Sequence, residues 1–453
     1  MQPDNVEMFM NHTEISRELL DFISHSPSVF HAVDEIKSEL DRAGFVDLPE
    51  SAGWNLAAGG KYYAVRNSSS IIAFSIGSET DDLSFRIAAS HCDSPTFKLK
   101  AVPFLEGPDR YLRLNVEAYG GTIDSTWIDR PLSLAGRVLV SEDGCVRAKN
   151  VYIDKDILLI PNVAIHFNRE VNSGVALNRQ TDMCPLVSAG EITADEFNRL
   201  IAEAAGTSPE NIVDRELYLV NRQKGTVWGL KDEFISSPKL DDLQCAFASL
   251  KGFLSAENPR SVNVFCCFDN EEVGSGTKQG ALSTFLKDCL ERICFSLGKS
   301  RDEYCRAVSR SFLLSADNAH AVHPNHPEKT DQENKCFLNR GLVIKENASQ
   351  KYTTDAFSRA IVRKICELAG EPFQLFANRS DCAGGSTLGN LSNSQVSLHA
   401  ADIGLPMLAM HSSFETAGSA DTLSAINVFS TYYRMNLVIN GSESFSVLSD
   451  SFR

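Results

Sequence analysis

The sequence predicts an α/β protein in which a mixed β-sheet, flanked by helices, carries an inserted β-rich domain. From Ser236 onward, strand-like apolar runs alternate with helical segments, which is typical of a sheet covered by helices on both faces. Between residues 97 and 235, short β-rich segments separated by turn residues indicate a mostly antiparallel unit. The length of 453 residues also favours two domains over one. We therefore expect a discontinuous domain, 1–96 and 236–453, and an inserted domain, 97–235.

The first part of the chain opens with helices. From Thr13 to about Gly44, apolar residues recur at helical spacing, and Pro27 is expected to divide this stretch into two helices. Two strand-like runs follow, at 71–77 and 85–91.

The inserted region contains strand-like runs and one clear helix. Thr193 and Glu196 form a capping-box pattern that predicts a helix start, and Gly206 supplies a plausible stop. The strand-like segments are 111–119, 133–141 and 157–167.

The remainder of the chain alternates between the two element types. We expect helices at 240–255, around 279–297 and at 355–369, with strands at 261–269, 312–317, 341–347, 373–379 and 406–412.

Bulk properties exclude several classes of function. A net charge of −16 argues against nucleic-acid binding, which needs a concentrated cationic face. No run approaches the roughly 18–20 apolar residues that span a bilayer, and the first 20 residues lack a basic region followed by an apolar one. The twelve cysteines are scattered without a CxxC pair, so we expect buried free thiols and a cytoplasmic protein.

Five separate segments place metal-ligating residue types beside predicted strands. Ligand sites of α/β sheets form at the carboxyl ends of strands, so these side chains could meet on one rim. Imidazole and carboxylate ligands in this mixture suit zinc, with cobalt or manganese as substitutes. The residues are His91 with Asp93 two positions on, Asp241–Asp242, Glu271–Glu272, Asp317 and His411.

The number of these residues matches a two-metal site. Two neighbouring cations need one bridging carboxylate and two further protein ligands each, which makes five ligands. A sixth carboxylate must then stay uncoordinated to act as the general base. The Glu271–Glu272 doublet offers both a ligand and a base.

Several ordered motifs resemble the aspartyl aminopeptidase family of dinuclear zinc exopeptidases along nearly the whole chain. They are HCDSP (91–95), LDDL (240–243), DNEEVGS (269–275), SADNAHAVHPN (315–325) and AMHS (409–412), with weaker matches at 160–169 and 343–345. The resemblance implies an aminopeptidase that removes an N-terminal residue, Asp or Glu, from peptides by means of a water activated by two metal ions.

The resemblance also implies roles for individual residues. Asp241 would bridge the metals, with Glu272 and His411 on one ion and His91 and Asp317 on the other. Glu271 would be the general base, and Asp93 would accept a hydrogen bond from the second ring nitrogen of His91. A cis peptide is expected after Asp241, and relatives often have Asn where this chain has Asp242.

Further expectations concern substrate and assembly. His166 of a neighbouring subunit would help to stabilise the reacting carbonyl, and Lys345 would meet an acidic first residue. Arg379 is a second candidate, from its place at a strand end. The family forms tetrahedral dodecamers built from dimers through the inserted domain.

Some of these residues also have simpler interpretations. Asp241 and Asp242 could merely cap a helix. His320, His323 and His326 are spaced like a metal site, but Pro324 and Pro327 favour a shaped loop. Rival functions are a dinuclear dipeptidase or deacylase on a related fold, and a non-catalytic shell-forming assembly protein.

Overall fold

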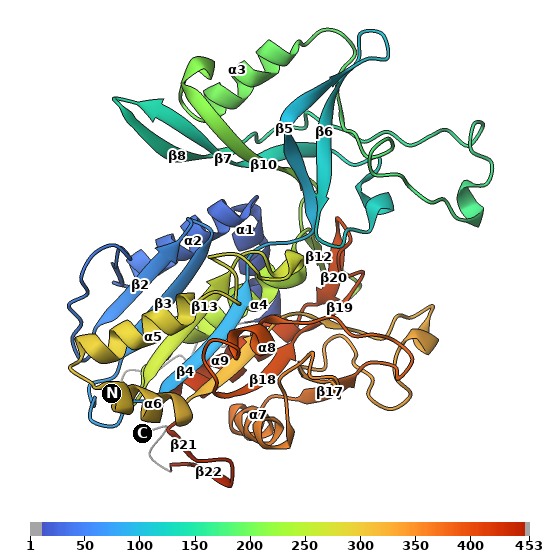
Figure 1. The fold of residues 1–453 in the computed structure, drawn as a ribbon. Coiled ribbons are helices and arrows are strands. Elements are labelled where there is room, and N and C mark those ends of the chain that lie inside the picture. The colour runs from blue at the N-terminus through green and yellow to red at the C-terminus, as the bar shows by residue number, and fades with distance from the viewer. Residues whose placement is uncertain (1–10, 449–453) are drawn as a thin grey trace, which may run out of the picture.

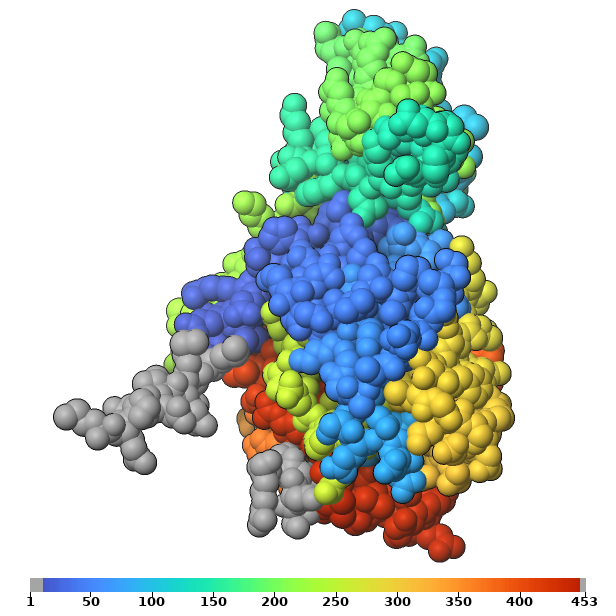
Figure 2. Space-filling view, turned by 90° about the vertical axis from the view of Figure 1, so that its left-hand side faces the viewer, coloured from blue at the N-terminus to red at the C-terminus, as the bar shows by residue number. Residues whose placement is uncertain are grey.

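The computed structural model describes residues 11–448; residues 1–10 and 449–453, and with them the start of the chain examined for a signal peptide, lie outside this range. A large α/β body carries a smaller β-rich part above it (Figure 1). In the space-filling view the smaller part projects as a separate lobe (Figure 2).

The body is built on a nine-stranded mixed sheet, which confirms the predicted fold class. Its four central neighbours, β13, β4, β14 and β18, run parallel, while β3 and β16 pair with them antiparallel. In sheet order the strands are β1 (Val46–Asp47), β2 (Lys61–Arg66), β3 (Ser70–Ile76), β13 (Val262–Phe268), β4 (Phe85–His91), β14 (Phe312–Ala316), β18 (His399–Gly404), β16 (Leu342–Glu346) and β17 (Phe373–Ala377).

Helices cover both faces of this sheet. Strand residues alternate between two cores: Ile71 and Ala73 pack into one, and Ile72 and Phe74 into the other, because successive side chains point to opposite faces. The first core contains α1 (His12–Ser24), α2 (Val29–Arg42), α4 (Leu240–Leu254), α7 (Ala356–Ala369) and α9 (Asp421–Arg434), and the second contains α5 (Phe285–Ser296), α6 (Arg301–Ser309) and α8 (Leu388–Ser392).

A second sheet of five short strands lies beside the main one. Its order is β11 (Thr226–Trp228), β12 (Phe234–Ser237), β20 (Glu415–Gly418), β19 (Pro406–Leu408) and β15 (Ala319–His320). A hairpin of β21 (Leu437–Asn440) and β22 (Ser444–Val447) follows α9.

The projecting lobe has its own sheet and its own apolar core. Its strands, in order, are β8 (Cys145–Tyr152), β7 (Leu132–Glu142), β10 (Ile212–Asn221), β5 (Thr96–Glu106), β6 (Leu112–Tyr119) and β9 (Leu186–Ser188), and α3 (Ala194–Ala204) packs against them. Short 3-10 turns occur at Asp124–Trp127, Val171–Ser173, Pro209–Asn211, Glu271–Val273 and Pro327–Lys329.

Local signals in the sequence are confirmed where they are strong. Two helices flank Pro27, and α3 begins with the predicted capping box of Thr193 and Glu196. Helix α5 starts at Phe285, later than the expected 279.

Two predicted strands are wrong in extent. The segment 157–167 forms only isolated bridges as far as Ile160, because Pro161 cannot donate to a ladder. The strand predicted at 406–412 ends at Leu408, because Ala409 and His411 adopt left-handed backbone conformations that interrupt it. It belongs to the five-stranded sheet.

Within residues 11–448, the longest helices are too short or too polar to cross a bilayer.

Candidate metal centre

Three strands of the main sheet bring side chains to one edge. His91 is the last residue of β4, and Asp317 directly follows β14. Glu271 and Glu272 lie in a 3-10 turn shortly after β13. Because β13, β4 and β14 are parallel neighbours, their carboxyl ends meet at this edge.

The five-stranded sheet supplies the other two residues. Asp241 follows β12 and stands in the distorted first turn of α4, where its peptide bond to Asp242 is cis, as expected. His411 lies three residues beyond β19, at a left-handed φ of 69°. The site therefore forms where the two sheets meet.

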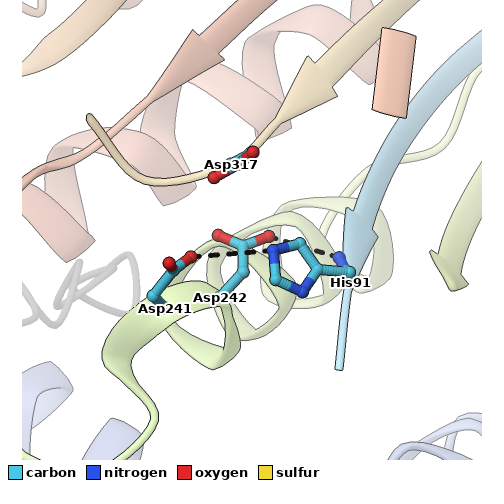
Figure 3. Close-up of side chains that lie close together, drawn as sticks. All are labelled: His91, Asp241, Asp242 and Asp317. Carbon is cyan, nitrogen blue, oxygen red and sulfur yellow. Dashed lines mark hydrogen bonds and ion pairs between the residues drawn. The ribbon is translucent and has the colours of Figure 1, made fainter. Parts of the chain in front are cut away.

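One carboxylate faces two histidines. Asp241 Oδ1 lies 3.6 Å from His91 Nε2, and Oδ2 of the same side chain lies 3.4 Å from His411 Nε2. Glu272 Oε2 is 3.3 Å from that same nitrogen of His411. Figure 3 shows Asp241, Asp242 and Asp317 gathered around the His91 ring. Asp241 thus lies between the two rings, with one carboxylate oxygen toward each.

The donor atoms fit metal binding. Ligand atoms within 4.8 Å of one another form three overlapping groups: His91–Asp241–Asp242–Asp317, His91–Glu271–Glu272 and Asp241–Glu272–His411. Buried oxygens of Asp241, Asp242 and Glu272 have no hydrogen-bond partner within the described chain. Uncompensated carboxylate oxygens are costly to bury, and a cation would satisfy them.

Hydrogen bonds orient both imidazole rings. His91 Nδ1 donates to the carbonyl oxygen of Asp93 at 3.0 Å and lies 3.3 Å from its carboxylate Oδ1. His411 Nδ1 donates to the carbonyl of Gly121 at 3.0 Å. The Nε2 atom of each ring is therefore left to face a metal ion.

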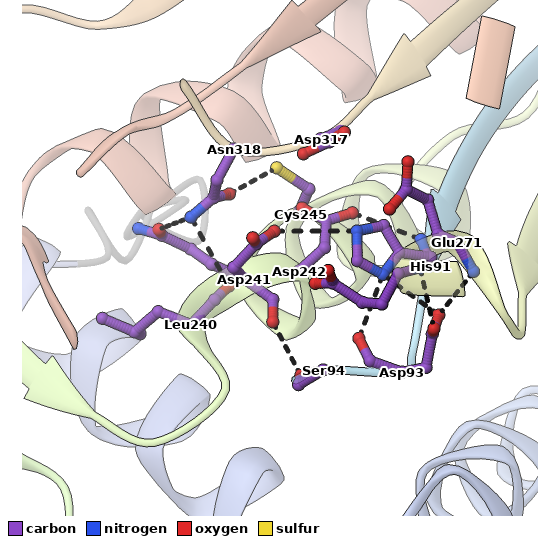
Figure 4. Close-up of polar contacts among 12 residues, drawn as sticks. His91, Asp93, Ser94, Leu240, Asp241, Asp242, Cys245, Glu271, Asp317 and Asn318 are labelled. Atoms are coloured by element: carbon purple, nitrogen blue, oxygen red, sulfur yellow. Dashed lines mark hydrogen bonds and ion pairs between the residues drawn. The ribbon is translucent and has the colours of Figure 1, made fainter. Parts of the chain in front are cut away.

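Asp93 also holds the turn that carries the two glutamates. Its carboxylate accepts the backbone N–H groups of Glu271 and Glu272, each at 3.1 Å, and the hydroxyl of Tyr119 at 2.7 Å. Figure 4 shows Asp93 below the His91 ring, with contacts to both sides. Asp93 thus links one histidine to the neighbouring acidic turn.

The concentration of negative charge shifts the pKa values of these groups. Burial raises the pKa of Glu271 to about 8, and the carboxylates of Asp317 and Asp93 add to the rise. Burial and Asp241 raise the pKa of Glu272 well above its usual range. Although burial alone would raise it, hydrogen bonds from His411 and His91 lower the pKa of Asp241. The buried carboxylates of Glu271 and Glu272 therefore favour their protonated forms unless positive charge is brought among them, which a bound cation would supply.

Asp242 belongs to this cluster although sequence reasoning gave it no role. Its Oδ2 accepts the backbone N–H of His91 at 3.2 Å, and its other oxygen is one of the unpartnered atoms. The doubled acid in LDDL was the available signal.

A pocket of about 200 Å³ opens at the cluster. Lys345 lines it and is buried; its Nζ donates to the carbonyl of Asn318 at 2.9 Å and lies 3.7 Å from Asp317 Oδ1. Among the described lining residues it is the single lysine or arginine. Lys345 was predicted, but eight residues that line the pocket were not assigned a role from the sequence: Asn318, Ala319, Tyr352, Phe376, Gly385, Ser386, Thr387 and Met410.

Two predicted residues lie elsewhere. Arg379 is not part of the lining; its guanidinium pairs with Asp381 at 2.6 Å and donates to the carbonyl of Glu328. His166 is exposed in an irregular segment of the projecting lobe and is also absent from the lining. Of the three histidines judged a false cluster, only His320 lines the pocket.

Known proteins match nearly the whole chain. Residues 22–433 match the family described as aminopeptidase I zinc metalloprotease (M18). A probable M18 family aminopeptidase 2 of Clostridium acetobutylicum is 44% identical over 94% of this chain and 100% of its own. Aspartyl aminopeptidase 1 of Schizosaccharomyces pombe is 40% identical over 92% of this chain and 94% of its own.

Solved structures agree with the sequence relatives. The cryo-EM structure of the Ape4 and Nbr1 complex matches with a TM-score of 0.90 at 38% identity, over 93% of this chain and 86% of that one. The S. cerevisiae mApe1 dodecamer matches with a TM-score of 0.82 at 27% identity, over 94% and 97%. The chain belongs to the M18 family of zinc metalloproteases and is an aminopeptidase.

Proposed function

We propose that this aminopeptidase removes an N-terminal Asp or Glu from peptides with the help of two divalent metal ions in each subunit. The observation that carries the proposal is the placement of Asp241 between His91 and His411, with one carboxylate oxygen toward each ring. Zinc is the proposed metal, because the family is a zinc family and the donors are imidazole and carboxylate. Cobalt or manganese would be able to replace it.

The proposed ligand sets follow the clusters. Asp241, Glu272 and His411 would hold one ion, as one of the compact groups supports. Asp241, His91 and Asp317 would hold the other. Asp93 would fix the ring orientation of His91 through the contacts at its Nδ1.

The residues of the chain would then share the chemical step. When bound, the ions would polarise the scissile carbonyl and lower the pKa of the attacking water. Glu271 would take the proton from that water and pass it to the leaving amine, a role that its place on the pocket wall beside the proposed ligands supports. A neighbouring subunit would supply His166, which would donate to the carbonyl oxygen as charge develops there.

Lys345 is the proposed determinant of substrate choice. A buried ammonium on the pocket wall would pair with the side-chain carboxylate of an N-terminal Asp or Glu. The 40% identity to an aspartyl aminopeptidase supports this preference. Arg379 would contribute only by leaving its pair with Asp381, so we rank it second.

The proposal extends to assembly and location. We propose a tetrahedral dodecamer built from dimers through the inserted domain 97–235, since a structural neighbour is a dodecamer. The twelve cysteines are free, which is consistent with a reducing, cytoplasmic setting. The net charge of −16 favours peptides over nucleic acids as partners.

One substrate panel tests the function. Purified enzyme would be assayed with Asp-, Glu- and Leu-terminal amides and with the N-acylated Asp amide, alongside elemental analysis of bound metal. We expect two metal ions per subunit and rapid cleavage of the free acidic substrates only. Preferred cleavage of the acylated substrate would favour the deacylase alternative, and a chain that is inert with every divalent metal would favour the assembly protein.

A further inference from the structure

A buried glutamate outside the predicted ligand set connects the two ligands that the five-stranded sheet delivers. Glu415 is the first residue of β20 and is 1% exposed. Its Oε2 accepts the backbone N–H of Asp241 at 3.1 Å, and its Oε1 accepts the backbone N–H of His411 at 2.7 Å. Each oxygen therefore holds one of two segments that are far apart in the sequence.

Both segments need such support. His411 and Ala409 have left-handed φ values of 69° and 58°, a conformation that non-glycine residues rarely adopt unless their surroundings impose it. The first turn of α4 is likewise non-helical at Asp241, so its N–H lacks a regular helical environment. The pairing of Ser237 with Glu415 in the sheet places the carboxylate at the point where β12 leads into α4.

We propose that Glu415 is a positioning residue for the metal centre. Its carboxylate accepts the backbone N–H groups of both Asp241 and His411 and thereby sets the distance between these two residues. The inference rests on the proposed function, in which these two residues bind the same ion. Its predicted effect is on metal affinity and coordination geometry before any effect on the chemical step.

The substitution Glu415→Gln tests this directly. An amide offers one acceptor oxygen, so one of the two N–H groups would face an NH₂ donor instead of an acceptor. We expect zinc to bind about 10–100-fold more weakly, as for other residues that orient ligands, and the visible absorption of the cobalt-substituted protein to change. Excess zinc should restore most of kcat, because Glu271 and the substrate pocket are unaltered.

Asp421 provides a matched control. It is also a 1% exposed carboxylate that accepts backbone N–H groups, from Asn339 at 2.7 Å and Gly341 at 2.9 Å. Within residues 11–448, neither of these bonds reaches a proposed ligand. Asp421→Asn should lower thermal stability by a similar amount while zinc affinity and the cobalt spectrum stay as in the wild type. Equal loss of zinc in both variants, or unchanged zinc affinity in Glu415→Gln, would overturn the inference.

A second variant covers the case in which Glu415→Gln does not fold. Glu415→Asp keeps the charge but is one methylene shorter, so it cannot reach both N–H groups and should also weaken zinc binding; wild-type affinity would contradict the role. Wild-type protein that binds no divalent metal would refute the proposed function itself. Wild-type protein that binds metal, with both Glu415 variants unaffected, would refute only the role of Glu415.

Discussion

At the scale of single residues, the neighbouring Glu271 and Glu272 are expected to have different roles, Glu271 as general base and Glu272 as metal ligand. Glu272 lies with Asp241 and His411 in one compact group, Glu271 lies with His91 and Glu272 in another, and both glutamates line the pocket. The 3-10 turn explains the difference, since consecutive side chains leave it in different directions. Asp93 fixes the turn through both backbone N–H groups, so each glutamate keeps its direction.

The substitution Glu271→Gln should separate catalysis from metal binding. Without a proton acceptor, kcat should fall by about 10²–10⁴-fold, the usual contribution of a general base. Elemental analysis should still find the wild-type metal content, because Glu271 is not a proposed ligand. Glu272→Gln is the comparison, and it should lose metal as well as activity. Full turnover by Glu271→Gln would remove the assigned base.

Substrate choice is predicted to depend on Lys345. Replacing it with Met removes a charge-assisted contact worth about 1.5–3 kcal/mol, so kcat/KM for an Asp-terminal substrate should fall by roughly 10–100-fold. The value for a Leu-terminal substrate should change far less. Metal content must be measured in parallel, because Lys345 Nζ lies 3.7 Å from Asp317.

Arg379→Met is the control for Lys345. Its guanidinium is already engaged by Asp381 and lies outside the pocket lining, so the ratio of Asp to Leu cleavage should stay constant. If the ratio of Asp to Leu cleavage stayed unchanged in Lys345→Met and fell in Arg379→Met, Arg379 and not Lys345 would be the residue that recognises the acidic side chain.

At the scale of elements, α4, which carries Asp241 in its first turn, packs closely against α9. Gly252 of α4 lies so close to α9 that an added Cβ would come within 2.4 Å of Phe429 Cβ and 3.0 Å of the Ser430 nitrogen. These are backbone and Cβ atoms that cannot move without shifting α9. A side chain here would therefore force the two helices apart.

Gly252→Ala should consequently destabilise the protein although alanine favours helices. The propensity gain is about 1 kcal/mol, and the overpacking cost is about 1–3 kcal/mol and dominates in a dense core. We expect a lower midpoint in denaturant unfolding. Gly53→Ala, where nothing lies within 4 Å of the added carbon, should leave the midpoint nearly unchanged. A stabilised Gly252→Ala variant would show that α4 and α9 can separate without cost.

Elements that depend on local signals were predictable, and those that depend on distant partners were not. The capping box at Thr193, Pro27 and the apolar runs identify α1, α2, α3, β4 and β13, because their causes lie within a few residues. The five-stranded sheet joins short strands from three parts of the chain, 226–237, 319–320 and 406–418, which no local pattern reveals. His411 was therefore placed at the end of a strand, although its left-handed loop is held by Glu415. Glu415 was missed for the same reason, whereas Asp242 stood in the LDDL motif without an assigned role.

At the scale of the whole molecule, the projecting lobe exposes an apolar surface around His166. Phe167 is 87% exposed, and Val163 and Ile165 are 55% and 48% exposed. Apolar side chains gathered on one irregular segment favour contact with another protein surface. Such a contact with a second copy of the chain would bring His166 toward a neighbouring pocket, as the proposed assembly requires.

Mixing two inactive variants tests whether His166 acts between subunits. His166→Ala and Glu271→Gln should each be nearly inactive alone while keeping their metal. When they are coexpressed as mixed dimers, a subunit with intact Glu271 can receive an intact His166 from its partner. About a quarter of wild-type kcat should return, because half of randomly formed dimers are mixed and each has one complete site. Mass spectrometry of the purified oligomers would verify the mixing. Activity no higher than that of the separate variants, in verified mixed oligomers, would mean that His166 serves its own subunit or has no catalytic role.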